Sequence, residues 1–286
     1  MHKLKIAATG LTGLIGSRIH ELLKDEIDFV PLEEVSMDIT DASAVHKTLH
    51  TTDFDILLHL AAFTDVDRAE VEKDLAYRVN VAGTKNVFET VQNMGKKLIH
   101  ISTDFVFDGK NPPYFEDSTP NPISYYGQTK YKAERLVQGK AMIVRPSYPY
   151  RATFLAKKDL VRSIVDVLRS GKRMYGITDQ IITLTFIDDI ALALKHLSTH
   201  YKPEIYHVIG QDSLSGYDAI MTICEVFGFD KSKVGKTTFD EFYRGKAPRP
   251  RNSIIKSKKN NFYPMKTFRE GLEEIKKQLE ASSQAP

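Results

Sequence analysis

The chain has 286 residues, of which 42% are hydrophobic and 27% charged, and its formal net charge is +3. The length allows one large domain or two modest ones, and the composition is globular, which excludes a largely disordered chain. So small a net charge gives no support to nucleic-acid binding, and no apolar run is long enough to span a membrane.

The sequence contains a single cysteine, Cys224, in an apolar stretch. One cysteine makes neither an internal disulfide nor a cysteine-based metal site, so we expect a buried thiol and a reducing compartment. The N-terminus enters a strand without the layout of a signal peptide. These features predict a soluble, cytoplasmic protein.

The first half of the chain alternates short apolar runs with helical patterns. The predicted elements are a strand at 4–10, a helix at 14–24, a strand at 28–32, a helix after the N-cap Asp41, a strand at 54–62, helices within 65–94 and a strand at 96–107. This alternation predicts a Rossmann-type, doubly wound α/β domain with a parallel sheet.

The pattern becomes less regular after residue 150. The predicted elements are a helix at 157–170, a mixed segment at 173–197, a strand at 205–210, a helix after Gly216 and an amphipathic helix at 268–283. We therefore predict a Rossmann domain over 1–150 and a smaller α/β lobe over 151–286. Residues around 177–200 are expected to return to the first domain.

Three glycines lie between the first strand and the first helix. Glycines permit a tight turn and a close backbone approach, and a helix N-terminus attracts an anion. A dinucleotide pyrophosphate needs this arrangement, although the spacing is G-x-x-G-x-x-G rather than G-x-G-x-x-G, and a turn without ligand is the alternative. The residues predicted to bind NAD(H) or NADP(H) are Gly10, Thr12, Gly13, Leu14, Ile15 and Gly16.

The choice between these cofactors depends on charge near the end of the second strand. Glu33 and Glu34 lie there, and an acidic side chain binds the ribose 2′-OH but repels a 2′-phosphate. Arg18, early in the first helix, would instead favour a phosphate. All three are equally compatible with solvated surface charges. We predict NAD on this basis.

Tyr126 and Lys130, within "YYGQTKYKAE", are four residues apart and share one face of a predicted helix. An ammonium stabilises phenolate and lowers the pKa of tyrosine from about 10. Such a phenol can protonate a carbonyl oxygen as hydride reaches its carbon, although many surface helices carry the same spacing. Tyr125 and Tyr131 have no lysine four residues on.

Ser102 and Thr103 end a predicted strand in "ISTDFVFDG". Open α/β sheets bind ligands at the carboxyl ends of their strands. A hydroxyl at this position can polarise a substrate carbonyl, or it can simply cap the strand.

Together these features resemble the extended short-chain dehydrogenase/reductase superfamily. Longer stretches are similar to the dTDP-4-dehydrorhamnose reductase family, namely "LHLAAFTDVDRAE", "NVAGTKNV", "ISTDFVFDGKNPPYFEDSTPNPISYYGQTKYKAE" and "RPRNSII". The resemblance covers most of the chain and is densest over 58–134. It implies NAD(P)H-dependent reduction of the 4-keto group of a nucleotide-activated 6-deoxy sugar, with 151–286 binding mainly the substrate.

The resemblance also implies roles for individual residues. The family's catalytic threonine, tyrosine and lysine fall on Thr103, Tyr126 and Lys130. Further cofactor positions are Glu33, Asp38, Ile39, Ala61 and Ala62, with Tyr126 and Lys130 contributing. Positions toward the nicotinamide or the sugar nucleotide are Val106, Ser147, Tyr148, Arg249 and Asn252. Looser matches in supporting roles are Asn80, Asp179 and Gln180.

Within the basic C-terminal segment, Arg249 has the planar guanidinium that suits a nucleotide diphosphate. Two departures from the family concern the substrate side. "DQIITLT", residues 179–185, lacks the family's glycine and proline, and Tyr148 stands where the family has tryptophan. These departures bring the identity of the sugar into question and leave the cofactor prediction intact.

No histidine is paired with carboxylates at a metal-ligand spacing, so no protein-built metal site is predicted. His59 and His100 are expected in the core. We expect a nucleotide sugar as ligand, neither nucleic acid nor membrane as partner, and an assembly compatible with a homodimer.

Two other functions stay open. The first is an NAD-dependent sugar-nucleotide epimerase or dehydratase, but Asp104 is followed by Phe105 and not by the second acid of dehydratases. The second is a non-catalytic regulatory subunit resembling the beta subunit of methionine adenosyltransferase. The presence of Thr103, Tyr126 and Lys130 weakens that alternative.

Overall fold

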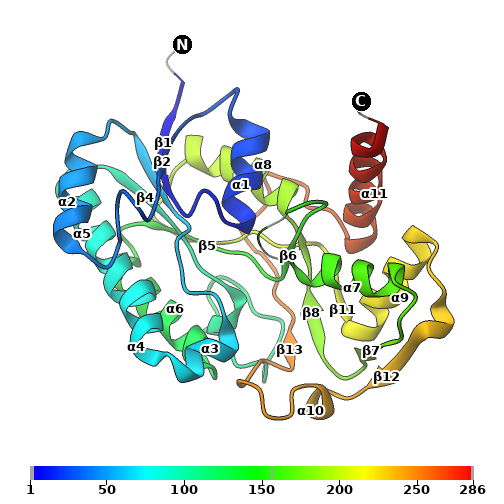
Figure 1. The fold of residues 1–286 in the computed structure, drawn as a ribbon. Helices are drawn as coiled ribbons and strands as arrows, with labels where there is room; N and C mark the ends of the chain where they lie inside the picture. Colours follow the sequence, from blue (N-terminus) through cyan, green and yellow to red (C-terminus); the bar gives the residue numbers. More distant parts are fainter. Residues whose placement is uncertain (1–2, 155, 157, 285–286) are drawn as a thin grey trace.

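The computed structural model describes residues 3–154, 156 and 158–284 (Figure 1). Its largest sheet has six strands in the order β10-β5-β4-β3-β1-β2, and each neighbouring pair is parallel. The strands are β1 (Lys5–Thr9), β2 (Asp28–Leu32), β3 (Ile56–His59), β4 (Lys97–Ile101), β5 (Met142–Arg145) and β10 (Ile205–His207). The predicted Rossmann-type parallel sheet is confirmed.

The direction of strand addition reverses at β1. The chain runs from β1 outward to β2 and then returns past β1 to β3, so that Ala7 pairs with Val30 on one side and Leu57 on the other. The connections after β1 and β3 therefore lead to helices on opposite faces of the sheet. In open α/β sheets this switch point is where ligands bind.

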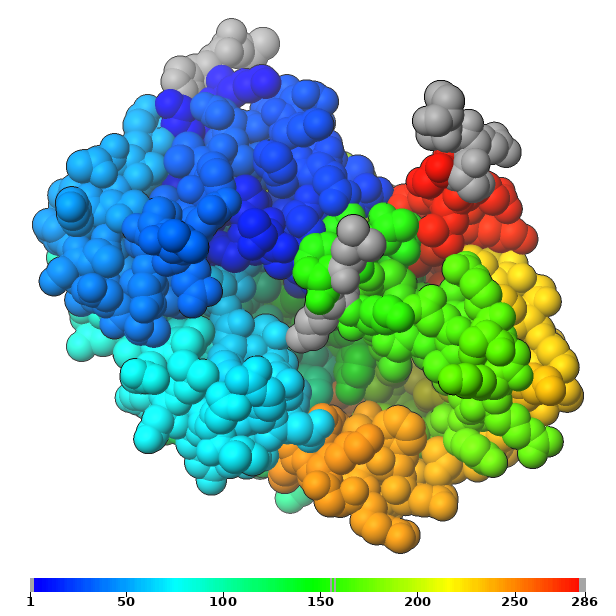
Figure 2. Space-filling view, in the orientation of Figure 1, coloured from blue at the N-terminus to red at the C-terminus, as the bar shows by residue number. Residues whose placement is uncertain are grey.

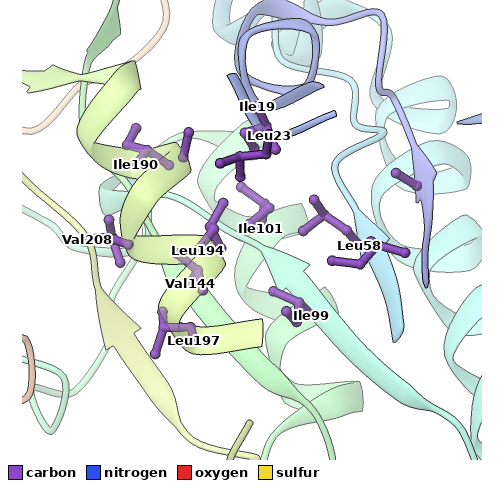
Figure 3. Close-up of a cluster of buried hydrophobic side chains, with 14 of the residues drawn as sticks. Ile19, Leu23, Leu58, Ile99, Ile101, Val144, Ile190, Leu194, Leu197 and Val208 are labelled. Carbon is purple, nitrogen blue, oxygen red and sulfur yellow. The ribbon is translucent and has the colours of Figure 1, made fainter. Parts of the chain in front are cut away.

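Helices cover both faces of this sheet, and its central strands β3, β4 and β5 are largely buried as a result. α1 (Leu14–Leu23) and α8 (Ile187–Thr199) bury Ile19 and Leu194 against Ile99 and Ile101 (Figure 3). The opposite face is covered by α2 (Ala42–Thr51), α5 (Thr84–Asn93) and α6 (Tyr125–Val137). Shorter helices on the α5–α6 side are α3 (Val66–Val71), α4 (Lys73–Tyr77) and a π-helical turn at Arg78–Gly83.

A second region lies beside the large sheet and is built on small sheets, β11-β8-β13, β12-β7 and β6-β9. Its strands are β6 (Pro149–Tyr150), β7 (Met174–Ile177), β8 (Ile181–Thr183), β9 (Thr185–Phe186), β11 (Ser213–Ser215), β12 (Val234–Thr237) and β13 (Asn252–Ser253). Its helices are α7 (Leu160–Arg169), α9 (Gly216–Phe227), α10 (Phe239–Phe242) and α11 (Phe268–Gln284). Short 3₁₀ turns occur at Asp104–Val106 and Lys231–Lys233.

The core of this second region contains Ile164, Ile223 and Leu272, and Cys224 is buried there as expected. The predicted helix at 157–170 corresponds to α7, and Lys157 lies outside the described residues. The chain then returns to the large sheet, because α8 packs on α1 and β10 pairs with β5.

The space-filling view is hollowed between the blue-to-cyan part of the chain and the green-to-orange part (Figure 2). The carboxyl ends of the large sheet's strands and the second region thus frame one cleft. Within residues 3–154, 156 and 158–284, none of the helices combines the length and apolar character of a membrane span.

Candidate active site

The glycine loop brings the backbone after β1 against the backbone after β3. Gly10 has a φ of 67°, and its carbonyl accepts a hydrogen bond from the Gly13 N–H at 3.0 Å. A Cβ on Gly10 would lie 2.7 Å from the Ala61 nitrogen, and one on Gly16 would lie 2.5 Å from the Gly10 oxygen. Both approaches are too close for any residue but glycine.

The same loop leaves the start of α1 open to a ligand. Gly13 occupies the N-cap position without a side-chain hydrogen bond, and both Thr12 and Gly13 are exposed. The N–H groups of Leu14, Ile15 and Gly16 belong to the first turn of α1, where N–H groups have no carbonyl partner within the helix. A backbone cradle with free N–H groups at a helix N-terminus fits the pyrophosphate of a nicotinamide dinucleotide.

The other predicted cofactor residues lie around the same crevice. Glu33 and Glu34 are exposed in the turn after β2, and Asp38 Oδ1 accepts the Thr40 N–H at 2.8 Å. Ile39 is buried and touches Gly83. Ala61 and Ala62 follow β3 and are half-buried.

Arg18 is engaged elsewhere. Its Nε and Nη2 donate to the two carboxylate oxygens of Asp188 on α8, each at 2.7 Å, and Nη1 donates to Glu21 at 3.0 Å. The guanidinium therefore ties α1 to α8. The structure does not offer Arg18 as a partner for a ribose phosphate.

The start of α6 is held by two hydrogen bonds. Ser124 caps the helix by accepting the Gly127 N–H at 3.1 Å, and Glu70 Oε1 of α3 accepts the Tyr125 N–H at 2.7 Å. A Cβ on Gly127 would lie 2.3 Å from the Phe105 oxygen, so α6 lies directly on the segment that follows β4. These contacts place Tyr126 beside Thr103.

Lys130 lies one turn further along α6 and is almost completely buried. Its Nζ donates to the Ile101 carbonyl at the end of β4, at 2.8 Å. Burial lowers the pKa of the Lys130 ammonium to about 8, and nearby Glu134 acts in the opposite direction. Glu134 itself forms a buried pair with Arg145, with separations of 2.8 and 2.6 Å.

The structure brings the predicted triad of Thr103, Tyr126 and Lys130 together at the carboxyl end of β4. The Thr103 hydroxyl lies close enough to the Tyr126 phenol to lower its pKa. Burial nevertheless raises the pKa of Tyr126 overall, and Asp104 raises it further. The expected net lowering by Lys130 is therefore wrong, because desolvation of the phenolate outweighs the other effects.

The residues predicted to bind substrate lie in different environments. Val106 is completely buried among Phe107, Tyr114 and Ile255, so its side chain cannot reach a ligand. Its carbonyl accepts the Asn121 N–H at 2.9 Å. Asn252 lies in β13 and pairs in register with Ile181 of β8.

Ser147 and Tyr148 form the turn that follows β5. Ser147 is fully buried, whereas Tyr148 is half-buried and has a φ of 38°, a strained value for a bulky residue. The Tyr148 ring lies 6.2 Å from that of Phe105, between their centroids. Burial raises the pKa of the Tyr148 phenol.

Arg249 crosses from the second region to the first. Its Nη1 and Nη2 donate to the carboxylate oxygens of Asp67 at 2.9 and 2.8 Å, and its side chain is 12% exposed. The Ala247 N–H donates to the same carboxylate at 2.9 Å. Arg249 is thus paired with Asp67 and is not a free cation in this structure.

The residues predicted to have supporting roles form hydrogen bonds within the protein. Asn80 bonds to Phe63 and Thr129, Asp179 accepts from Arg251 and from the Phe239 N–H, and Gln180 donates to the Pro250 carbonyl. His59 and His100 are buried within β3 and β4, where they pair in register. Within the described part of the chain, no group of three or more His, Cys, Asp or Glu side chains could hold a metal ion.

Three residues at the site have no role in the predictions above. Asp104 and Ser253 are buried beside Thr103, and Glu70 holds the start of α6. Asp104 and Glu70 lie inside the family-like stretches, so the sequence could have drawn attention to both residues. Their contacts could not be predicted, since these contacts join segments far apart in the chain.

Comparison with known proteins agrees with this geometry. The family model described as RmlD substrate binding domain matches residues 4–281. The chain belongs to the dTDP-4-dehydrorhamnose reductase family. The family resemblance expected from the sequence is therefore confirmed.

Individual relatives share much of the chain's length. It is 29% identical to a dTDP-4-dehydrorhamnose reductase from Aggregatibacter actinomycetemcomitans, over 88% of this chain and 90% of that one. It is 27% identical to Methionine adenosyltransferase 2 subunit beta from Xenopus tropicalis, over 85% and 78%. The crystal structure of dTDP-4-dehydrorhamnose reductase from Bacillus anthracis in complex with NADP is 32% identical, with a TM-score of 0.90 over 97% and 100%.

The Bacillus anthracis comparison bears on the cofactor. The neighbouring structure holds NADP, so a nicotinamide cofactor is supported and the predicted preference for NAD is not.

Gly16→Ala tests the backbone cradle. The new Cβ would meet the Gly10 oxygen at 2.5 Å and the Leu11 Cα at 2.7 Å, which forces the loop apart. We expect the Kd for NADPH or NADH, measured by calorimetry, to rise about tenfold or more, a loss of about 1.4 kcal/mol.

Gly216→Ala at the start of α9 is the matched control, because its Cβ would meet no atom closer than 3.3 Å. This variant should bind cofactor normally. Unchanged affinity in a folded Gly16→Ala protein would contradict the cradle.

Proposed function

We propose that the protein reduces the 4-keto group of a dTDP-activated 6-deoxy sugar to a hydroxyl, using NADH or NADPH. The convergence of Thr103, Tyr126 and Lys130 at the carboxyl end of β4 carries this proposal. Membership of the dTDP-4-dehydrorhamnose reductase family supports the substrate class.

Each of the three side chains has one task. Tyr126 gives its phenolic proton to the keto oxygen, and its raised pKa keeps that proton in place until the oxygen gains negative charge. The Thr103 hydroxyl donates a hydrogen bond to the same oxygen and polarises the carbonyl. The Lys130 ammonium, anchored to Ile101, supplies positive charge beneath the tyrosine as phenolate forms.

The glycine loop and the start of α1 hold the pyrophosphate of the cofactor, and Ala61 and Ala62 line the crevice beside it. When bound, the reduced nicotinamide supplies the hydride. Lys130 has further N–H groups beyond the one donated to Ile101, which suit a ribose hydroxyl. The protein thus binds and orients the cofactor and controls the proton.

We place the sugar nucleotide in the cleft between a cofactor-binding part, residues 1–150, and a mainly substrate-binding part, residues 151–286. Arg249 lies at this boundary, with its guanidinium paired to Asp67. A guanidinium has five N–H donors, so it can hold Asp67 and still offer donors to a diphosphate. Tyr148, in the turn after β5, belongs to the first part, and Asn252, in β13, belongs to the second.

The two alternatives receive less support. A dehydratase or epimerase returns hydride to the same sugar, and Phe105 stands where a dehydratase has its second acid. A regulatory subunit is the alternative suggested by the Xenopus relative, but such a subunit does not require Thr103, Tyr126 and Lys130 to converge.

Tyr126→Phe tests the proposed reaction. Removing the hydroxyl leaves no proton donor at the keto oxygen, so kcat should fall by about 10²–10⁴. The assay follows NADH and NADPH consumption separately with dTDP-4-dehydro-6-deoxy-L-mannose, and cofactor binding should be retained.

Tyr125→Phe is the control, since Tyr125 is the neighbouring tyrosine on α6 and has no contact with Thr103 in the described structure. It should keep nearly full activity. A Tyr126→Phe protein as active as the wild type would exclude the proposed mechanism.

The preference between NADH and NADPH is proposed to depend on the exposed turn after β2. Glu33 and Glu34 bring two carboxylates to this edge of the crevice, and Arg18 is held by Asp188. Carboxylates there disfavour a 2′-phosphate relative to a 2′-OH.

The double variant Glu33→Gln/Glu34→Gln should therefore lower the Kd for NADPH by roughly fivefold, the scale of exposed charge interactions, and leave that for NADH unchanged. Asp25→Asn, an exposed acid beyond α1, should change neither. Equal changes for both cofactors would show that these carboxylates do not face the ribose.

A further inference from the structure

Asp104 is a buried acid at the reaction site whose role is not explained by the proposed mechanism. It directly follows Thr103 and is only 3% exposed. The Thr103 hydroxyl donates to its Oδ1 at 3.2 Å. The same hydroxyl oxygen accepts the Phe105 N–H, also at 3.2 Å.

A threonine hydroxyl has a single hydrogen. While that hydrogen is given to Asp104, it is not available to the keto oxygen of a substrate. The hydrogen bond seen here therefore competes with the one that the reduction requires of Thr103.

The other oxygen of Asp104 lies among unpartnered hydroxyls. Asp104 Oδ2, Ser147 Oγ and Ser253 Oγ are buried, and none has a hydrogen-bond partner within the described residues. Both serines lie close enough to the carboxyl to stabilise its charge. They come from the turn after β5 and from β13, so this cluster joins the two parts of the cleft.

A proton on Asp104 would remove the negative charge from a buried oxygen that has no hydrogen-bond donor in the described structure. The Oδ1 of the neutral acid is also a weaker acceptor for the Thr103 hydroxyl. Burial favours this neutral form and raises the pKa of the carboxyl to about 6, although the hydroxyls of Ser147, Thr103 and Ser253 act against the shift.

The charge of Asp104 also matters to its neighbours. The titratable groups that face it are Tyr126 on α6 and Tyr148 after β5, and the Asp104 carboxylate raises the pKa of each. A negative charge that disfavours phenolate at these positions also disfavours negative charge on a keto oxygen between them.

We propose that Asp104 is a positioning residue that acts through Thr103: its neutral form releases the Thr103 hydrogen to the substrate oxygen, and its ionised form withholds it. This inference rests on the proposed function, because it assumes a keto oxygen at Thr103 and Tyr126. No bond is made or broken at Asp104. Its proton stays on the carboxyl during turnover.

The test is the pH dependence of kcat/KM for reduction, which reports ionisations of the free enzyme. In the wild type the active form is the one with neutral Asp104, so kcat/KM should fall as the pH rises through about 6. Asp104→Asn is permanently neutral and keeps an acceptor and a donor. Its kcat/KM should fall only through about pH 8, where Lys130 loses its proton.

Asp117→Asn removes an exposed acid that pairs with Lys258 and should leave the wild-type profile unchanged. A falling limb that stays at the wild-type position in Asp104→Asn would overturn the proposal. So would a folded, cofactor-binding Asp104→Asn protein that is inactive at every pH, since that would mean the carboxylate is required.

If Asp104→Asn does not fold, Ser253→Ala gives an independent test. Losing this hydroxyl removes one group that lowers the pKa of Asp104, so the falling limb should move to higher pH. A falling limb that stays at the wild-type pH or moves to lower pH would contradict the proposal. The Tyr126→Phe variant distinguishes failure of the proposed function from failure of the Asp104 proposal. If the proposed function is wrong, Tyr126→Phe is as active as the wild type, whatever the Asp104 variants do.

Discussion

The hydrogen bond from Lys130 Nζ to the Ile101 carbonyl is the contact on which the site depends. It fixes α6 against the end of β4 and holds a buried ammonium at the carboxyl end of the sheet. A buried charge is stable only when it is paired or hydrogen-bonded, and Lys130 has both this carbonyl and the charge of Glu134 nearby. The same anchoring brings Tyr126 to Thr103. The Glu134–Arg145 ion pair, which is also buried, links α6 to β5.

Much of the fold and part of the site could be predicted from the sequence because they depend on local patterns. A strand covered on both faces is predominantly apolar, as Ile56, Leu57 and Leu58 in β3 show, so apolar runs suffice to identify the parallel sheet. Gly10 and Gly16 can be recognised from their spacing between a predicted strand and a predicted helix, and the structure supplies the reason, since backbone stands where a Cβ would be. The spacing of Tyr126 and Lys130 fixes their common helix face, and that spacing is independent of the rest of the chain.

The rest depends on contacts between distant segments, which spacing does not encode. Arg249 pairs with Asp67 across 182 residues and Arg18 with Asp188 across 170, and the sequence does not show that a carboxylate holds each guanidinium. The segment after β4 turns the Val106 side chain into a small core, which spacing along the chain does not show. The pKa of Tyr126 rises rather than falls because burial and the Asp104 carboxylate both raise it and together outweigh the effect of the Thr103 hydroxyl. Asp104 becomes notable only once Ser147 and Ser253 are seen beside it.

The central claim is that Tyr126, Thr103 and Lys130 direct a hydride to the keto carbon of a sugar nucleotide. The most direct measurement uses a reduced nicotinamide cofactor carrying two deuterons at C4, together with dTDP-4-dehydro-6-deoxy-L-mannose, in a single turnover followed by NMR of the sugar. The account predicts one deuterium bound to C4 of the sugar and one equivalent of oxidised cofactor. Unlabelled C4 with the cofactor still reduced at the end of the reaction, in protein that binds both ligands, would contradict it.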